Sequence, residues 1–427
     1  MRRDAVLLSA LLVLAPSAAG AGDRPVAEIE QPQALGRFFE SLSRLERTRG
    51  GTVRVVQLGD SHTAADHQSA AARRALQARF GDAGRGTVLF GQAVPGEAVR
   101  LGTSGEWHSE QARRSAGERG DGRYGLGGWA VASSARGARA WLDGGAPSGR
   151  VELAYLKQPS GGSFEVLVGG ERRAKLSAWS PSPRSAWETL ELGRTPRAAV
   201  EIRLEGDGEV RLLGASLERP GPGLVYDALG INGARASVLL EWDEAHLVEQ
   251  LSHRSPDLVV LAYGTNESGE RGAGEAWERQ LAAGLERIAR AAPTAACLVL
   301  GPPDRAAPGQ KGWASLPALP QVVAAQRRAA QAAGCAYFSQ YDAMGGEGSM
   351  VAWAAESPPR AARDRVHLTR EGYGQLGAAF AAALVSSYDR WSEAEMAKGS
   401  GGALADKGGK EAGRPEETRK VAREAAR

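Results

Sequence analysis

Four residues at the end of an apolar segment carry the first chemical signal in this chain. Residues 52–58 indicate a strand, Gly59 permits a tight turn, and Asp60, Ser61 and His62 follow where a helix should begin. Ligands of doubly wound sheets bind at the carboxyl ends of strands, where helix amides also stabilise negative charge. The corner therefore suits a serine nucleophile. Asp60 and Ser61 are also common N-cap residues, so the four residues alone equally fit a plain helix cap.

A serine nucleophile needs a base, because its hydroxyl attacks weakly at neutral pH. Among the six histidines, His367 stands three residues after Asp364 in the segment ARDRVHLTREGYGQLG. That spacing lets the carboxylate fix the tautomer and orientation of the imidazole, as in a catalytic triad. An isolated Asp-x-x-His is more often a surface turn. We find no set of ligands at metal-binding spacing.

Acyl transfer also needs hydrogen-bond donors for the oxyanion. Asn266 follows the apolar segment 257–264, which places its amide at the same sheet edge as Ser61. Gly230 and Gly233, in the segment GINGA, follow another strand-like segment, and either could donate its backbone N–H. The alternative for Asn266 is an ordinary turn residue.

The elements that must position these residues alternate between strand and helix. Apolar strands without alternation are predicted at 52–58, 224–229, 257–264, 296–301 and 335–340. Helices are predicted at 34–49, 66–80, 234–251, 276–291, 320–333 and 371–388. Unalternating strands between helices indicate a parallel sheet covered on both faces. The fold class is therefore α/β, a three-layer sandwich, and the family resemblance described below implies its flavodoxin-like form.

Residues 93–220 have a different pattern. Short alternating segments such as VELAYL and SFEVLVGG are separated by Gly, Pro and Ser, which predicts an antiparallel β-sandwich inserted into the α/β domain. The short apolar run 87–90 just before it could form a second parallel strand. The insertion would then leave from the catalytic edge of the sheet. Residues 123–133 could border the mouth of the site.

Five tryptophans of the insertion could stack on sugar rings, although we expect most of them individually to be core residues. They are Trp107, Trp129, Trp141, Trp179 and Trp187.

The two ends of the chain differ from the rest. Arg2 and Arg3, an apolar run and a small-residue site near Ala21 predict a cleaved secretory signal over residues 1–21, with a membrane anchor as the alternative. The hydrolase domain would comprise 34–92 and 221–391. Residues 392–427 are charged and lack large apolar residues, which predicts a disordered tail.

The net charge and the two cysteines indicate which partners and which redox state to expect. Net charge is +3 with both signs scattered, so we expect no nucleic-acid binding. Cys297 and Cys335 could pair in an oxidising compartment, but their apolar surroundings slightly favour two buried thiols. We expect an exported protein, secreted or periplasmic, with no membrane segment in the mature chain.

Together these motifs resemble the SGNH (GDSL-type) hydrolase superfamily. Its four blocks match Gly59-Asp60-Ser61, then Gly233 or Gly230, then Gly264-Thr265-Asn266, then Asp364 to His367. The resemblance implies Ser61 as nucleophile, His367 as base and Asp364 as its orienting carboxylate. It also implies an oxyanion hole made by the Ser61 amide, the Gly233 amide and the Asn266 side chain.

One departure is informative, because His62 replaces the leucine that usually follows the serine. GDSHT, GINGA and LAYGTNE look like the exported branch that acts on acetylated polysaccharides, notably peptidoglycan O-acetylesterases, whose inserted β-sandwich resembles a carbohydrate-binding module. This predicts a serine esterase that deacetylates a cell-wall or extracellular glycan, most simply peptidoglycan, without metal or organic cofactor. The alternatives are a polysaccharide O-acetyltransferase, a lipase or thioesterase, and a non-catalytic glycan-binding protein.

Overall fold

The computed structural model describes residues 27–405, apart from 95–98, 113–118, 144–148, 193–198 and 271–273. The predicted secretory signal and residues 406–427 lie outside the described residues. No helix in the described ranges is long and apolar enough to cross a membrane.

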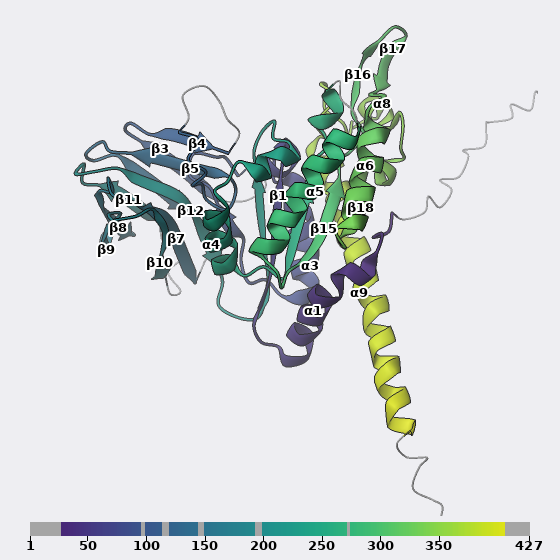
Figure 1. Cartoon of the computed structure of the whole chain (residues 1–427), viewed down its shortest axis with the longest axis horizontal. Helices are drawn as coiled ribbons and strands as arrows, with labels where there is room; N and C mark the ends of the chain where they lie inside the picture. Colours follow the sequence, from purple (N-terminus) through teal and green to yellow (C-terminus); the bar gives the residue numbers. More distant parts are fainter. Residues whose placement is uncertain are drawn as a thin grey trace, which may run out of the picture.

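A five-stranded parallel sheet forms the centre of the α/β part (Figure 1). Its strands are β1 (Thr52–Gly59), β13 (Gly223–Gly230), β14 (Leu258–Ala262), β15 (Ala296–Gly301) and β18 (Ala336–Ser339). They lie in the order β13-β1-β14-β15-β18. Numbered along the chain this is 2-1-3-4-5, the flavodoxin-like order, whose switch point lies between β1 and β14. The predicted α/β fold class is confirmed.

Helices cover both faces of this sheet (Figure 1). One layer contains α1 (Gly36–Thr48), α3 (His67–Phe80) and α9 (Arg370–Ala405); the other contains α4 (Glu244–Arg254), α5 (Gly274–Ala291) and α6 (Leu319–Ala332). The buried strand residues alternate between the two layers. On β14, Leu258 and Val260 pack with the first layer, whereas Val259 and Leu261 pack with the second. Burial on both faces explains why these strands lack polar alternation.

The all-β part consists of two antiparallel sheets that enclose an apolar core. One sheet has the order β10-β7-β12-β5-β4, with β2 paired to β12, and the other has the order β3-β6-β11-β8-β9. The strands are β2 (Gly86–Val88), β3 (Arg100–Ser104), β4 (His108–Gln111), β5 (Trp129–Ser133), β6 (Arg139–Asp143), β7 (Arg150–Lys157), β8 (Ser163–Val168), β9 (Glu171–Ser177), β10 (Arg184–Glu191), β11 (Val200–Leu204) and β12 (Val210–Glu218).

The expectation of a parallel strand at 87–90 is wrong. β2 pairs antiparallel with β12, with Val88 opposite Ala215, so the first strand of the sandwich precedes the predicted boundary at 93. An apolar run this short does not reveal which of two sheets it joins. The insertion therefore does not leave from a second parallel strand.

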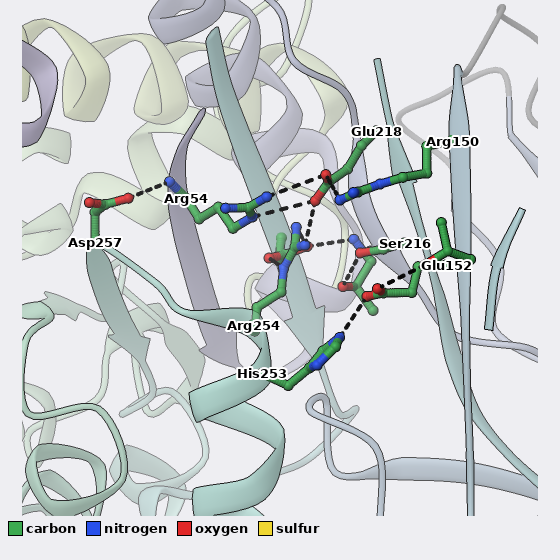
Figure 2. A network of polar contacts seen from close by, with 11 residues as sticks. Arg54, Arg150, Glu152, Ser216, Glu218, His253, Arg254 and Asp257 are labelled. Atoms are coloured by element: carbon green, nitrogen blue, oxygen red, sulfur yellow. Dashed lines mark hydrogen bonds and ion pairs between the residues drawn. The ribbon is translucent and has the colours of Figure 1, made fainter. Parts of the chain in front are cut away.

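A network of buried ions joins the sandwich to the parallel sheet (Figure 2). Arg254 of α4 donates to Asp227 of β13 through Nε at 2.6 Å and to Glu218 of β12 through Nη1, also at 2.6 Å. Glu218 also accepts from Arg54 of β1 and from Arg150 of β7. Burial of these charges is tolerated because each carboxylate has a guanidinium partner. The network thus ties three elements of the α/β part to two strands of the sandwich.

Three further expectations change. The helix predicted at 234–251 is divided into the 3-10 helix η2 (Ala236–Leu240) and α4, which begins after its N-cap Asp243. Cys297 and Cys335 form a disulfide rather than two thiols, because the pairing of β15 with β18 brings the two residues together. Helix α9 continues to Ala405, so the first part of the expected tail at 392–427 is helical.

The sequence analysis did not predict three small elements between β15 and α9. They are the hairpin of β16 (Ala306–Gly309) and β17 (Gly312–Ser315), and the short helices α7 (Gln340–Met344) and α8 (Ser349–Ala355). A 3-10 helix, η1 (Pro32–Leu35), also precedes α1, and η3 (Glu267–Gly269) follows β14.

Candidate active site

The structure brings Ser61, His367 and Asp364 into one chain of hydrogen bonds. Ser61 Oγ lies 2.9 Å from His367 Nε2, and His367 Nδ1 lies 2.8 Å from Asp364 Oδ2. Ser61 is the first residue of the short helix α2 (Ser61–Ala64), and only Asp60 separates it from the end of β1. His367 lies in the turn before α9. Residues 306 positions apart therefore meet at the carboxyl edge of the sheet.

The turn around Asp364 holds this carboxylate in place. Asp364 Oδ1 accepts the backbone N–H groups of Val366 and His367, each at 3.0 Å. The intervening Arg365 adopts a left-handed conformation with φ 52°. Burial acts to raise the pKa of Asp364, but hydrogen bonds from His367 and the backbone outweigh it and hold the pKa below its usual range. The ionised carboxylate can therefore stabilise a positive imidazole.

The helix-cap alternative applies to Asp60 rather than to Ser61. Asp60 is the N-cap residue of α2, and its Oδ1 accepts the backbone N–H of His62 at 2.9 Å. The hydroxyl of Ser61 instead faces His367 Nε2. The arrangement is that of a nucleophile and a base within hydrogen-bond reach.

His62 packs behind the site. Its Nδ1 lies 2.9 Å from Tyr373 Oη, and its ring centroid lies 5.3 Å from that of His367. Burial, together with the charge on His367, lowers the pKa of His62 to about 3. His62 is consequently neutral at physiological pH and does not compete as a base.

Asn266 and the two candidate glycines surround the same edge. Asn266 Nδ2 donates one hydrogen bond to Ala234 O at 2.8 Å, which leaves the second hydrogen of the amide for another acceptor. Gly230 ends β13 opposite Gly59, and a side chain there would meet Ala64 N at 2.2 Å. Gly233 lies in the following turn with φ 75°. Gly230 thus serves close packing, which leaves Gly233 as the glycine of the turn beside Asn266.

Sequence reasoning missed a pair of buried acids behind this edge. Glu267 follows Asn266, and its carboxylate accepts Ala236 N at 2.8 Å and Gly264 N at 3.1 Å. Burial raises its pKa. Burial, reinforced by the charge on Glu267, also raises the pKa of Asp60 to about 7. Glu267 thereby links the turn that contains Gly233 to the end of β14. The sequence could not single out this residue, because its burial distinguishes it from other glutamates and a sequence does not show burial.

Part of the sandwich also reaches this region. A side chain at Gly128 would meet Ile231 at 2.8 Å, and one at Gly127 would meet Leu229 at 3.3 Å. Residues 123–133 therefore pack beside the turn that leads to Gly233. Within the described ranges, no group of three or more His, Cys, Asp or Glu residues is arranged to hold a metal ion.

The sandwich tryptophans fall into two groups. Trp107 and Trp129 are half-buried against the sandwich core, whereas Trp187 is half-buried and stacks on His253 of α4. Trp141 and Trp179 are 37% and 58% exposed, which overturns the expectation of a core position for these two. Trp141 lies across Gly102, where the missing side chain makes room for the indole.

Comparisons with known proteins agree with this geometry. The model of the GDSL-like lipase/acylhydrolase family matches residues 197–375, which include Asn266, Asp364 and His367. Ser61 lies before the matched residues, because the sandwich separates it from the remaining motifs. No curated protein sequence gives a significant match.

Solved structures extend the comparison over most of the chain. A peptidoglycan O-acetylesterase is 25% identical, with a TM-score of 0.71, and the match covers 84% of this chain and 99% of that one. A family two carbohydrate esterase from Clostridium thermocellum is 12% identical over 65% of this chain and 97% of its own, with a TM-score of 0.28. The triad geometry, the family model and the first of these structures lead to one conclusion: the chain resembles the GDSL-type (SGNH) hydrolases in fold and site, and it is a hydrolase of ester bonds.

Proposed function

We propose that this hydrolase is an exported O-acetylesterase of peptidoglycan, with Ser61 as its nucleophile. The observation that carries the proposal is the Ser61–His367–Asp364 chain of hydrogen bonds, at 2.9 Å and 2.8 Å, next to Asn266. The structural match to a peptidoglycan O-acetylesterase supports the substrate, because it covers 84% of this chain and must therefore include residues of the sandwich. The predicted secretory signal supports export.

The reaction follows from the positions of these groups. Ser61 Oγ attacks the acetyl carbonyl while His367 Nε2 takes its proton, and Asp364 stabilises the resulting imidazolium. The N–H groups of Ser61 and Gly233 and the second amide hydrogen of Asn266 bind the oxyanion. His367 then gives its proton to the sugar oxygen as its bond to the acetyl carbon breaks, so that the sugar leaves with a free hydroxyl and an acetyl-serine remains. Water, deprotonated by His367, attacks this ester and releases acetate and Ser61.

Acetate release tests the proposal directly. Purified protein is incubated with O-acetylated peptidoglycan, acetylated xylan and a short-chain model ester, and acetate is quantified. We expect the highest kcat/KM on peptidoglycan and a loss of about 10⁴-fold or more for Ser61→Ala. Hydrolysis of xylan in preference to peptidoglycan would contradict the substrate. Retention of more than a tenth of the activity by a folded Ser61→Ala variant would contradict the nucleophile.

The same reaction distinguishes a transferase. When an excess of a non-acetylated glycan acceptor is added, a hydrolase continues to release one acetate for each ester consumed. A transferase would instead convert the acceptor into acetylated glycan, since the acceptor hydroxyl would replace water in the second step.

A further inference from the structure

A β-hairpin stands directly beside the triad. β16 and β17 pair four residues each and extend beyond the body of the α/β part at the top of Figure 1. The buried carboxylate of Asp304 anchors the base of the hairpin. It accepts Ser315 Oγ at 2.8 Å and the Met350 backbone N–H at 2.9 Å. The hairpin is therefore attached to α8 by a buried polar contact, and its position relative to the triad is defined.

The hairpin contacts the turn that contains Asp364 and His367. Ala306 N donates to Arg365 O at 2.9 Å. The guanidinium of Arg365 lies 4.4 Å from the centroid of the Trp313 ring, on the opposite strand of the hairpin. Trp313 is nevertheless 39% exposed, so Arg365 does not cover it. A large aromatic surface and a cation thus lie together, two residues from the proposed base.

A second cation lies between the hairpin and the proposed oxyanion site. Arg305 immediately precedes β16 and is half-buried; its Nη1 donates to Thr265 O at 2.7 Å, next to Asn266. The negative charges of Asp364 and Asp60 both act on this guanidinium. Within the described residues, the guanidinium of Arg305 makes only this hydrogen bond, so most of its five N–H groups are left to donate to a substrate.

The turn before His367 has more basic than acidic side chains. The turn contains Arg363 and Arg365 next to the single acid Asp364, whose Oδ2 is engaged by His367. Planar guanidinium groups bind carboxylates with two parallel hydrogen bonds, and aromatic faces provide rigid apolar contact. A neutral glycan would use the aromatic face alone, whereas an acidic sugar would use both kinds of group.

We propose that Arg305, Arg365 and Trp313 form a subsite for a carboxylate-bearing sugar adjacent to the acetylated position. Trp313 would contact the face of the sugar ring, and the two guanidinium groups would bind its carboxylate. This inference rests on the proposed function and specifies it: the enzyme recognises the acidic character of the glycan strand, in addition to its acetyl ester. The three residues are specificity determinants and take no part in the bond changes.

Paired substrates test the subsite. O-acetylated peptidoglycan strands freed of stem peptides expose their carboxylates, and conversion of these groups to amides gives a neutral strand with the same esters. A short-chain acetyl ester reports on the triad alone. Each variant is compared with wild type on all three substrates, and circular dichroism verifies folding.

The variants separate charge from stacking. Arg305→Ala should lower kcat/KM on the charged strand about 10- to 100-fold, mainly through KM, and Arg305→Lys should restore part of it. The loss should be at least five times smaller on the amidated strand and on the small ester. Trp313→Ala should cost about three- to tenfold on both strands, with recovery in Trp313→Phe. Met396→Ala, which removes an exposed apolar side chain of α9, is the control and should change activity on neither strand.

Two results overturn the inference while leaving the proposed function intact. One is a wild-type enzyme that deacetylates charged and amidated strands with equal kcat/KM. The other is an Arg305→Ala loss of equal size on all three substrates, which would make Arg305 a support of the triad. By contrast, a wild-type enzyme that hydrolyses the small ester but neither strand overturns the proposed function and the subsite together.

Discussion

Two sets of buried carboxylates in this molecule differ in what neutralises them. Asp227 and Glu218, between the sandwich and the sheet, share the buried guanidinium of Arg254. Asp60 and Glu267, behind the catalytic edge, are held mainly by backbone N–H groups. Arg254 and Arg54 outweigh burial and lower the pKa of Glu218 to about 2, whereas burial raises the pKa of Asp60 to about 7.

The comparison shows that position alone does not decide the role of a buried acid. With a guanidinium partner, the carboxylate stays charged and joins two domains. Without one, it gains protons near neutral pH, and its hydrogen bonds position the loops of the site. Glu267 illustrates the second case, because its two backbone contacts connect Ala236 and Gly264. Four stability measurements can break or sharpen this distinction.

Removal of the shared guanidinium should have the largest effect. Arg254→Met leaves Asp227 and Glu218 buried without their main partner, and we expect a loss of about 3–5 kcal/mol in the free energy of unfolding. Urea denaturation measures it. Arg328→Met, which breaks an exposed pair with Glu278, is the matched control and should cost less than about 1 kcal/mol. Equal losses in both variants would show that the network adds no more than a surface pair.

Asp60, behind the catalytic edge, should make the free energy of unfolding fall as pH rises. The pKa of Asp60 rises from 3.8 to about 7 on folding, so ionisation opposes folding. Wild type should therefore lose stability relative to Asp60→Asn as pH rises from about 4 to 7, by up to roughly 4 kcal/mol. Denaturation of both proteins across this range gives the difference curve. A flat curve would mean that Asp60 is ionised in the native state.

For Glu218, the stability difference between wild type and Glu218→Gln should change with pH in the direction opposite to that of Asp60. The pKa of Glu218 falls from 4.5 to about 2 on folding, so its charge contributes stability that is complete above pH 4.5. We expect the substitution to cost about 1–3 kcal/mol at neutral pH and progressively less as pH falls from 4.5 toward 2. A cost that is independent of pH in that window would assign the effect to packing instead of charge.

The smallest effect is expected at the outer part of the network. Glu152 lies 3.0 Å from His253 Nε2, and both side chains are partly exposed (Figure 2). Glu152→Gln should reduce the free energy of unfolding by less than about 1 kcal/mol, because solvent screens the pair. Thermal denaturation of Glu152→Gln and Arg254→Met in parallel compares the two losses of stability. A loss comparable to that of Arg254→Met would extend the tightly coupled network to its surface.

The sequence predicted the parts of the fold in which local pattern and tertiary environment agree. The strand at 296–301 is confirmed residue for residue as β15, because an unalternating apolar run suits a strand buried on both faces. The hairpin of β16 and β17 was not predicted from the sequence. Its strands pair with each other and project away from the core, where no apolar pattern is needed. The run 87–90 was misassigned because its partner β12 is remote in sequence.

For the site, motifs placed on strand ends located Ser61, Asn266, Asp364 and His367, and the structure brings these residues to one edge. Motifs could not indicate Glu267, Arg305 or Trp313 as neighbours of that edge. An exposed tryptophan and a buried one look alike in sequence, and the pKa of Asp60 depends on the depth at which the fold places it. Likewise, the sequence did not show that a side chain at Gly230 would meet Ala64 N at 2.2 Å, or that Gly233 has a φ of 75°.

The long helix α9 also determines how the enzyme can be attached to a support. It begins at Arg370, three residues after His367, and its 36 residues span about 54 Å before Ala405. In Figure 1 it extends away from the body on the side opposite the hairpin. A linker fused beyond Ala405 would therefore join the molecule at its far pole. Protein immobilised in this way would present its catalytic edge outward, toward a bulky insoluble polymer.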